Sequence, residues 1–252
     1  MKITFLGTGT STGVPQIGCT CQTCQSKDPK DHRLRSSVLI EEGNSRILID
    51  CGPDFREQML NVPFKPITGV LLTHEHYDHV GGLDDLRPFC KFGPIDVWGN
   101  KSCLNHVKER MPYCFEKKSV GIPQLNLRPI ETNHSFLIDG IEITPINIFH
   151  GALPIYGYRI NNIVYITDML HLASEEEKEK MKEADVLIIN ALRNTPHPTH
   201  QTLENAIRLA REVGANNTFF IHMSHQIGLH QEIEALLPKK MHLAYDKLEV
   251  IV

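Results

Sequence analysis

The sequence HEHYDHVGG occupies residues 74–82 and directly follows Val70–Thr73, which we expect to be a buried strand. So many polar groups at the end of a buried strand are costly unless each has a partner. Imidazole nitrogens and carboxylate oxygens are ligands that Zn²⁺ and related divalent ions take in catalytic sites. A histidine-rich surface turn is the structural alternative. The spacing favours a metal site, whose candidate ligands divide between a first ion and a second: His74 and His76, then Asp78 and His79.

Composition narrows the classes of protein that this chain can be. The chain has 252 residues, 41% of them hydrophobic, so we expect a single domain over residues 1–252 with a sizeable core. The net charge of −4 excludes a protein that holds nucleic acid mainly by positive charge. No apolar run is long enough to span a bilayer, and the N-terminal sequence MKITFLGTGT is not a secretory signal. We therefore expect a cytoplasmic protein without a membrane partner.

Hydrophobic periodicity predicts strands followed by one or two helices, in a pattern that occurs twice. The predicted strands are Lys2–Leu6, Ser37–Glu41, Arg46–Asp50, Val70–Thr73, Asp96–Trp98, Ile141–Ile148, Tyr156–Ile160, Ile163–Thr167, Val186–Asn190, Thr218–Ile221 and Leu248–Val252. The predicted helices are Leu83–Phe89, Lys101–Arg110, Ser174–Glu183, Thr202–Val213 and Leu229–Leu236. A Ser174/Glu177 capping box is expected to open the third of these helices. Two β-rich halves packed face to face with helices outside would satisfy this pattern.

The stretch THEHYDHVGG at residues 73–82 resembles the HxHxDH motif of the metallo-β-lactamase-fold hydrolases. LGTGTSTGVP at residues 6–15 and LIDCG at Leu48–Gly52 extend the resemblance over essentially the whole chain. Within that superfamily the chain is most similar to the phosphoribosyl cyclic phosphodiesterase family of the carbon–phosphorus lyase pathway, and less so to ribonuclease Z. The resemblance implies an α/β protein, a four-layer αβ/βα sandwich of metallo-β-lactamase type.

The resemblance also implies three further ligands of a dinuclear centre, each at the end of a predicted strand. His150 matches the third histidine of the first metal, Asp168 the carboxylate that bridges both metals, and His222 the last histidine. Taken alone, Asp168 would more often be a turn or cap residue. The implied cofactors are two divalent ions, Zn or Mn, and Asp78 is counted among the catalytic residues. Such ions activate water and give the centre a small positive charge, which favours an anionic phosphoryl group.

A leaving alkoxide needs a proton, and His200 matches the general-acid histidine of the family. A histidine with a pKa near neutrality suits that role. Capping of the following helix, or simple exposure, is the structural alternative. His197 is a weaker candidate for the same role.

Three cysteines form a second group of metal ligands in CxCxxC spacing: Cys19, Cys21 and Cys24. By resemblance to the cyclic phosphodiesterase family, His225 closes a structural zinc site, with the zinc loop at about residues 18–36. A redox CxxC pair and free thiols are the alternatives. The remaining cysteines are expected to be ordinary thiols: Cys51, Cys90, Cys103 and Cys114.

Three further residues are candidates for supporting roles. Asp50 resembles the family position that orients the histidine-rich loop through hydrogen bonds. Arg33 and Arg35 follow the cysteine loop and are candidates for contact with a substrate phosphate. A solvated or core-capping arginine is the commoner case.

These residues predict a dinuclear metal-dependent phosphodiesterase that hydrolyses a small anionic phosphate ester, linear or cyclic. A ribonuclease Z-like tRNA 3′-processing endonuclease is a rival, but only 18 positions separate His150 from Asp168, where that family inserts its tRNA-binding arm. We therefore do not expect a nucleic-acid partner. A lactone or thioester hydrolase on the same site, and a non-catalytic metal-binding scaffold, are further alternatives. The sequence leaves a homodimer open.

Overall fold

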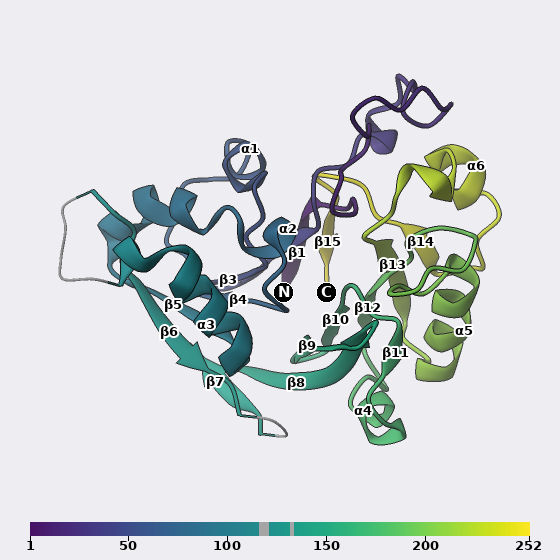
Figure 1. The fold of residues 1–252 in the computed structure, drawn as a ribbon. Coiled ribbons are helices and arrows are strands. Elements are labelled where there is room, and N and C mark those ends of the chain that lie inside the picture. Colours follow the sequence, from purple (N-terminus) through teal and green to yellow (C-terminus); the bar gives the residue numbers. More distant parts are fainter. Residues whose placement is uncertain (116–120, 132–133) are drawn as a thin grey trace.

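The strands form two sheets, and the first sheet carries the histidine-rich loop. The computed structural model describes residues 1–115, 121–131 and 134–252 (Figure 1). The first sheet has seven strands in the order β15-β1-β2-β3-β4-β5-β6. Their bounds are Glu249–Ile251 (β15), Lys2–Gly7 (β1), Ser37–Glu42 (β2), Ser45–Ile49 (β3), Gly69–Leu71 (β4), Ile95–Gly99 (β5) and Leu125–Pro129 (β6). The pairing of β1 with β15 brings the two ends of the chain together, and the Met1 amino group donates to the Val252 carbonyl oxygen.

The second sheet has eight strands in the order β11-β8-β9-β10-β12-β13-β14, with β7 paired to β8. Their bounds are Phe136–Ile138 (β7), Ile141–His150 (β8), Leu153–Ile160 (β9), Ile163–Ile166 (β10), His171–Leu172 (β11), Val186–Asn190 (β12), Asn217–Ile221 (β13) and Met241–Leu243 (β14). β10, β12, β13 and β14 run parallel to one another. The C-terminal ends of β10 and β13 therefore lie at the same edge of the sheet.

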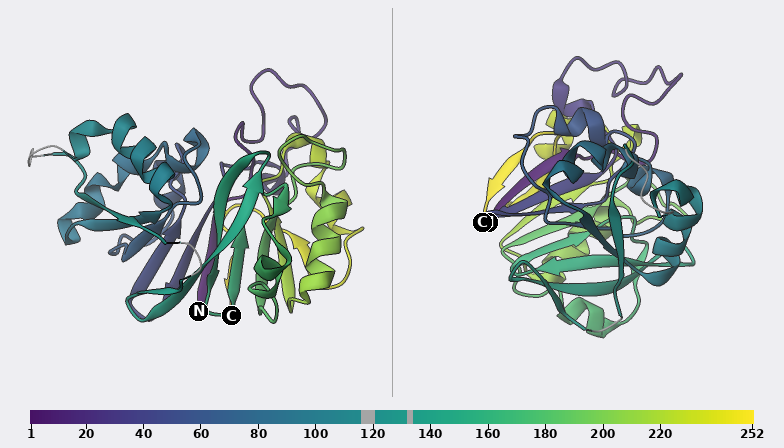
Figure 2. Two further views of the ribbon diagram at one scale, coloured as in Figure 1. Left: turned by 60° about the horizontal axis from the view of Figure 1, so that its bottom comes forward. Right: turned by 90° about the vertical axis from the view of Figure 1, so that its left-hand side faces the viewer.

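Helices lie on the outer sides of the two sheets (Figure 2). The α-helices are Phe55–Met59 (α1), Tyr77–Val80 (α2), Lys101–Arg110 (α3), Glu175–Glu179 (α4), Leu203–Val213 (α5) and His230–Glu234 (α6). In α5 the Thr202 side chain accepts a hydrogen bond from Asn205 N, and Gly214 ends the helix with a φ of 73°. No helix in the described parts of the chain is both long and apolar enough to cross a membrane.

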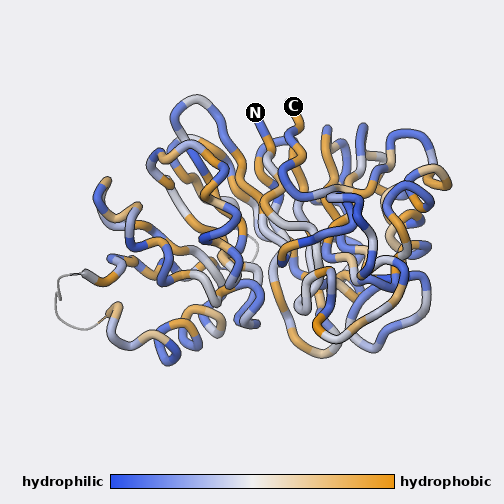
Figure 3. Tube along the Cα trace, turned by 90° about the horizontal axis from the view of Figure 1, so that it is seen from above, coloured by the Kyte–Doolittle hydropathy of each residue, from blue (hydrophilic) through white to orange (hydrophobic). Residues whose placement is uncertain are grey.

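Buried apolar side chains form three clusters, one between the two sheets and one on the outer side of each sheet. Phe5, Tyr158 and Ile188 belong to the cluster between the two sheets. A second cluster packs the first sheet against α1, Leu83–Phe92 and α3, and a third packs the second sheet against α5. In the hydropathy view, hydrophilic residues are frequent in the outer loops (Figure 3). Helices, sheet, sheet and helices thus form the predicted four-layer αβ/βα sandwich.

Two predicted helices differ from the structure. Leu83–Phe89 forms a 3₁₀ helix that extends over Leu83–Phe92 and contains Pro88, which cannot donate to a regular helical ladder. The helix predicted at residues 174–183 covers only α4, and the Ser174 side chain makes no capping hydrogen bond. The Glu177 carboxylate instead accepts from the backbone and side-chain amides of Asn147 at 2.8 and 2.9 Å. The prediction of a capping box is therefore wrong.

Two glycines hold the histidine-rich loop against the end of β3. A Cβ atom on Gly52 would lie 2.1 Å from the carbonyl oxygen of Asp78, and one on Gly82 would lie 2.0 Å from the carbonyl oxygen of Gly52. Both contacts are with backbone atoms, which a side-chain rotation cannot relieve. The loop that carries the candidate ligands therefore requires glycine at these two positions.

We predict that Gly52→Ala lowers the free energy of unfolding by about 2 kcal/mol or more, because the added methyl group displaces the Asp78 backbone. Urea denaturation measures the loss, and metal content after purification should fall with it. Gly43→Asn is a matched control, because Gly43 has a φ of +58° and open space around its Cβ position. Equal stability of the two variants would contradict the proposed role of this close backbone contact.

Candidate metal centre

The candidate ligands lie where strands of both sheets end. His74 follows β4, His150 is the last residue of β8, Asp168 lies two residues after β10, and His222 directly follows β13. Asp168 and His222 have positive φ angles of 55° and 55°, which non-glycine residues adopt rarely. Such strain is retained when the surrounding structure fixes it, and it occurs often at functional sites. The fold thus aims these side chains at one place between the two sheets.

The first set of ligand atoms belongs to His74, His76 and His150. The candidate atoms of the three residues all lie within 4.8 Å of one another. His74 Nε2 and His76 Nδ1 are 3.0 Å apart. His74 is fully buried, and burial, reinforced by the charge of His79, lowers its pKa well below the ordinary value. Three imidazoles that converge in this way form a donor set for one divalent ion.

The second set consists of Asp78, His79, Asp168 and His222, whose candidate atoms also lie within 4.8 Å of one another. His79 Nε2 is 3.1 Å from Asp78 Oδ2 and 3.2 Å from Asp168 Oδ2. It nevertheless makes no hydrogen bond of acceptable geometry with any residue that the structure describes. A buried nitrogen that faces two carboxylate oxygens without bonding to them fits a cation between the three groups.

The charges of the second set also suit a cation. Burial by itself would raise the pKa of Asp168, but His222 and His79 hold it well below the usual range. Burial likewise opposes ionisation of Asp78, whose pKa is lowered by His79. Both carboxylates are therefore negatively charged at neutral pH. Burial opposes the charged form of His79, but the neighbouring carboxylates raise its pKa well above the usual value, so this imidazole balances part of the negative charge. A metal ion would supply further positive charge.

Asp50 connects the two sets of ligands. Its carboxylate is fully buried, and Oδ2 lies 2.6 Å from Nδ1 of His79, a ligand of the second set. The same carboxylate accepts hydrogen bonds from the backbone and hydroxyl of Thr73. Thr73 Oγ1 in turn lies 3.0 Å from Nδ1 of His74, a ligand of the first set. The structure thus places Asp50 where the sequence predicts a positioning residue.

Other contacts that orient the ligands were not predicted from the sequence. Thr199 O lies 3.1 Å from His150 Nδ1, and Thr167 Oγ1 donates to Asp168 Oδ2 at 2.7 Å. Thr10 Oγ1 lies 3.2 Å from His222 Nε2. Thr167 directly follows β10, but Thr10 and Thr199 lie in loops, so no sequence signal marks the three as a group. Only the fold brings them beside the ligands.

His200 lies beside the centre, as the resemblance implies. Its Nδ1 is 3.9 Å from Asp168 Oδ1, and within the described residues that nitrogen has no hydrogen-bond partner. Burial lowers the pKa of His200 to about 3, below the near-neutral value expected from the sequence, so the free protein holds a neutral imidazole there. His197 is less buried, and its Nδ1 accepts a hydrogen bond from Thr199 N.

The predicted zinc ligands come together in the loop between β1 and β2, which projects above the sheets (Figure 1). The sulfur atoms of Cys19 and Cys21 lie 3.6 and 3.3 Å from Nδ1 of His225. Candidate atoms of these three residues and of Cys24 all lie within 4.8 Å of one another. A backbone hydrogen bond from Cys24, aided by His225, lowers the pKa of the Cys21 thiol to about 6. All seven cysteines are free thiols, and this cluster fits a four-coordinate zinc ion.

The two arginines proposed for phosphate contact have other partners. Arg33 is 2% exposed, and its guanidinium donates to Thr8 Oγ1 and the Ala244 carbonyl oxygen. It also lies 3.3 Å from His230 Nδ1. Arg33 is therefore a core-capping residue without access to a substrate, and the expectation of substrate contact is corrected. Burial removes it from the surface, which the sequence pattern HRLRSS does not reveal.

Arg35 is more accessible but is also engaged. Its Nη1 forms an ion pair with Asp54 Oδ1 at 2.8 Å, and its Nε donates to the Ser11 carbonyl oxygen. The Arg35 backbone amide donates to the second carboxylate oxygen of Asp54. Arg35 therefore fixes the start of α1, and contact with a substrate remains a prediction.

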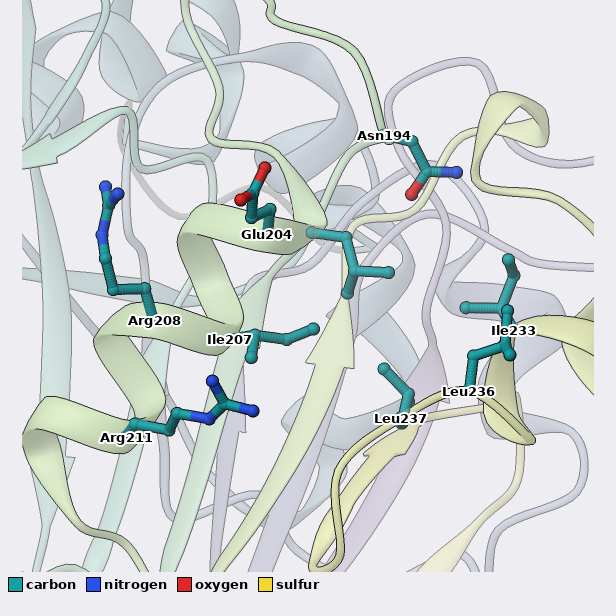
Figure 4. Close-up of a pocket in the computed structure, with 9 residues that line it drawn as sticks. Asn194, Glu204, Ile207, Arg208, Arg211, Ile233, Leu236 and Leu237 are labelled. Carbon is teal, nitrogen blue, oxygen red and sulfur yellow. The ribbon is translucent and has the colours of Figure 1, made fainter.

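Two cavities differ in how they lie relative to the candidate ligands. A cavity of about 640 Å³ lies between α5 and α6, with Ile207, Ile233 and Leu237 along it and Arg211 beside them (Figure 4). None of its lining residues belongs to the clusters that could hold a metal. A cavity of about 360 Å³ instead includes Glu75, which lies between two candidate ligands in the chain. The smaller cavity therefore adjoins the centre.

Comparison with known proteins agrees with this geometry. Residues 45–223 match the model of the Beta-lactamase superfamily domain, which is more than half of the chain. The chain therefore belongs to the metallo-β-lactamase superfamily, and proteins of that superfamily with this site are metal-dependent hydrolases. Within the superfamily it is a member of the PhnP family. A crystal structure of a diphosphatase from the PhnP family is 36% identical, covers 99% of this chain and 97% of that one, and has a TM-score of 0.92.

Curated relatives add two further similarities. A protein of Porphyromonas gingivalis named octanoyltransferase is 44% identical over 255 residues, covering 100% of this chain and 52% of the relative. Ribonuclease Z of Bacillus licheniformis is 27% identical over 220 residues, covering 85% of this chain and 61% of the relative. The chain thus spans about half to three fifths of the length of these relatives. The resemblance read from the sequence is confirmed at the level of the family.

We predict that Cys24→Ser lowers the zinc content by about one ion per chain, because a closed structural site loses one of its four ligands. Elemental analysis of the purified protein measures the loss, and the β1–β2 loop should become easier to cleave with protease. Cys90→Ser is the matched control, because this thiol lies outside the cluster and contacts Gln124. Unchanged zinc content in Cys24→Ser would contradict the proposed site.

We also predict that His230 contributes to the pH dependence of stability. Burial and the neighbouring Arg33 lower the pKa of His230 from 6.5 to about 4, so the folded state favours the neutral ring. This stabilisation is present above pH 6.5 and is lost as the pH falls toward 4, by up to about 3 kcal/mol. His230→Asn should therefore show a smaller fall in unfolding free energy between pH 7 and pH 4.5. The exposed His134→Asn is the control, and identical pH profiles for wild type and His230→Asn would refute the prediction.

Proposed function

We propose that this protein is a dinuclear metal-dependent phosphodiesterase that acts on a small anionic phosphate ester, linear or cyclic, or on a diphosphate. The observation that supports this most strongly is the pair of ligand sets, both complete, on a chain 36% identical to a PhnP-family diphosphatase. Divalent ions such as Zn²⁺ or Mn²⁺ bound by these sets supply Lewis-acid activation of water and stabilise negative charge at phosphorus. A complete donor set also argues against a non-catalytic scaffold.

The chain's own residues have distinct parts in this proposal. Asp78 is ionised, and its side chain is 11% exposed, more than that of any other member of the second set, so it can accept a hydrogen bond from the attacking water. Asp168 contributes the second buried negative charge and is held by the hydroxyl of Thr167. His200 is neutral in the free protein, and its remaining N–H can donate to the leaving oxygen. An anionic substrate beside this ring would raise its pKa and favour proton transfer.

Two alternatives are distinguished by particular observations. Between His150 and Asp168 the chain forms only β9, β10 and their short connections, so no arm is present there to hold a tRNA. Hydrolysis of a thioester is a second candidate, favoured by the relative named octanoyltransferase. That relative has about as much chain outside the matched part as within it, so its name covers more than this domain.

Turnover of a phosphodiester and of octanoyl compounds decides between a phosphodiesterase and a thioester hydrolase. Protein loaded with Mn²⁺ or Zn²⁺ should hydrolyse bis(4-nitrophenyl) phosphate, and a chelator should abolish the activity. The same preparation should leave 4-nitrophenyl octanoate and octanoyl thioesters almost untouched. Hydrolysis of the octanoyl compounds without phosphodiester turnover would overturn the proposed substrate class and favour the second candidate.

We predict that His200→Ala leaves metal content unchanged and lowers kcat by about 10²–10⁴-fold for diesters with a poor leaving group. The loss should be much smaller with 4-nitrophenolate, a leaving group that needs no proton. Comparing aryl and alkyl diesters of matched charge measures the difference. His197→Ala is the matched variant, since this histidine is farther from Asp168, and it should have a small effect on both classes. An equal loss for good and poor leaving groups would refute the role of His200.

A further inference from the structure

A fully buried side-chain amide, that of Asn190, lies at the end of β12, the strand between β10 and β13 in the second sheet. The other residues of β12 are aliphatic, and Asn190 belongs to none of the clusters that could hold a metal. A buried amide is costly unless both its donor and its acceptor have partners. The partners that Asn190 has chosen therefore indicate what the amide is for.

Both ends of the Asn190 amide bond the backbone of Met169, the residue directly after Asp168. The Met169 N–H donates to Asn190 Oδ1 at 3.0 Å, and Asn190 Nδ2 donates to the Met169 carbonyl oxygen at 3.0 Å. This N–H belongs to the planar peptide group that joins Asp168 to Met169. Asn190 thus fixes the peptide group that follows the left-handed conformation of Asp168, whose φ is 55°.

The same hydrogen bonds extend to His200. The Gln201 N–H, which belongs to the peptide group that joins His200 to Gln201, donates to the Met169 carbonyl oxygen at 3.0 Å. Gln201 Nε2 donates to the Asn190 carbonyl oxygen at 2.9 Å. Met169 and Gln201 are 1% and 3% exposed, so water does not compete for these bonds. The peptide groups directly after Asp168 and His200 are therefore held by one buried amide clamp, formed by Asn190, Met169 and Gln201.

We propose that Asn190 is a positioning residue, which directs Asp168 toward the candidate metal ions and, with Gln201, holds His200 beside it. The inference rests on the proposed phosphodiesterase function. Asparagine suits the position because one amide offers the donor and the acceptor that match a peptide C=O and N–H, whereas leucine of similar size offers neither. The two residues have separable effects, because the Asn190 side chain bonds the backbone after Asp168, whereas the Gln201 side chain adjoins only His200.

Metal binding tests the role of Asn190 without any turnover. Asn190→Leu removes both hydrogen bonds to Met169, so the affinity for Mn²⁺ should fall about 10–100-fold, as measured by titration with electron paramagnetic resonance detection of free Mn²⁺. Leu187→Ala, a fully buried residue on the other face of β12, is the matched control for lost stability and should bind Mn²⁺ like wild type. Asn190→Asp keeps the acceptor but loses the donor, and it should show the same loss if Asn190→Leu does not fold. Equal Mn²⁺ affinity of the Asn190 variants and Leu187→Ala would overturn the inference.

Kinetics with two classes of leaving group test the link to His200. Gln201→Met should keep the Mn²⁺ affinity of wild type and lower kcat about tenfold for alkyl diesters, with little change for 4-nitrophenyl diesters, whose leaving group needs no proton. A purely structural role of Gln201 would change both classes equally or not at all, and either result would overturn the link. Absence of phosphodiester turnover in wild type would refute the proposed function, whereas the Mn²⁺ affinities would still decide the role of Asn190.

Discussion

The carboxylate of Asp50 is the buried group on which the orientation of both ligand sets depends. It has no access to solvent, and its negative charge is matched by one imidazole and two donors of Thr73. Through His79 it fixes a ligand of the second set, and through Thr73 it fixes His74 of the first. A single buried charge thus helps to orient one ligand of each set. Asp50 directly follows β3, so the first sheet fixes the position of its carboxylate.

The backbone conformation of three residues at the metal centre also serves to orient their side chains. Asp50, Asp168 and His222 each follow a strand and each have a φ between 55° and 58°. An L-residue with this φ is disfavoured relative to an extended one, and the cost is borne by the surrounding sheet. The left-handed turn redirects the chain after the strand and brings the side chain to the metal centre, where Asp50 contacts His79 and Asp168 contacts His79 and His222. Rigid strands therefore supply the positions, and one strained residue at each end supplies the direction.

The sequence predicted the local parts of this arrangement well and the distant parts only through resemblance. His74, His76, Asp78 and His79 are adjacent in the chain, so spacing alone indicates their chemistry. Asp168 and His222 stand alone in the sequence, and only the order of strands in the second sheet brings them together. Arg33 was misjudged because a charged residue in a polar stretch gives no sign of burial. Strands β7, β11 and β14 were missed because they have only two or three residues and are stabilised by pairing rather than by their own periodicity, and the five-residue β6 was missed as well.

The cysteine loop and the metal centre are joined by the segment after β13. Met223 exchanges backbone hydrogen bonds with Thr8 and Thr10, so the N-terminal loop lies directly against it. This segment carries His222 of the second ligand set at one end and His225 of the cysteine cluster at the other. An ion held by the cysteines therefore restricts the same short stretch of backbone that sets the direction of His222. Ions held by the two clusters would thus fix the two ends of one short stretch, whose residues His222, Met223 and Ser224 are buried.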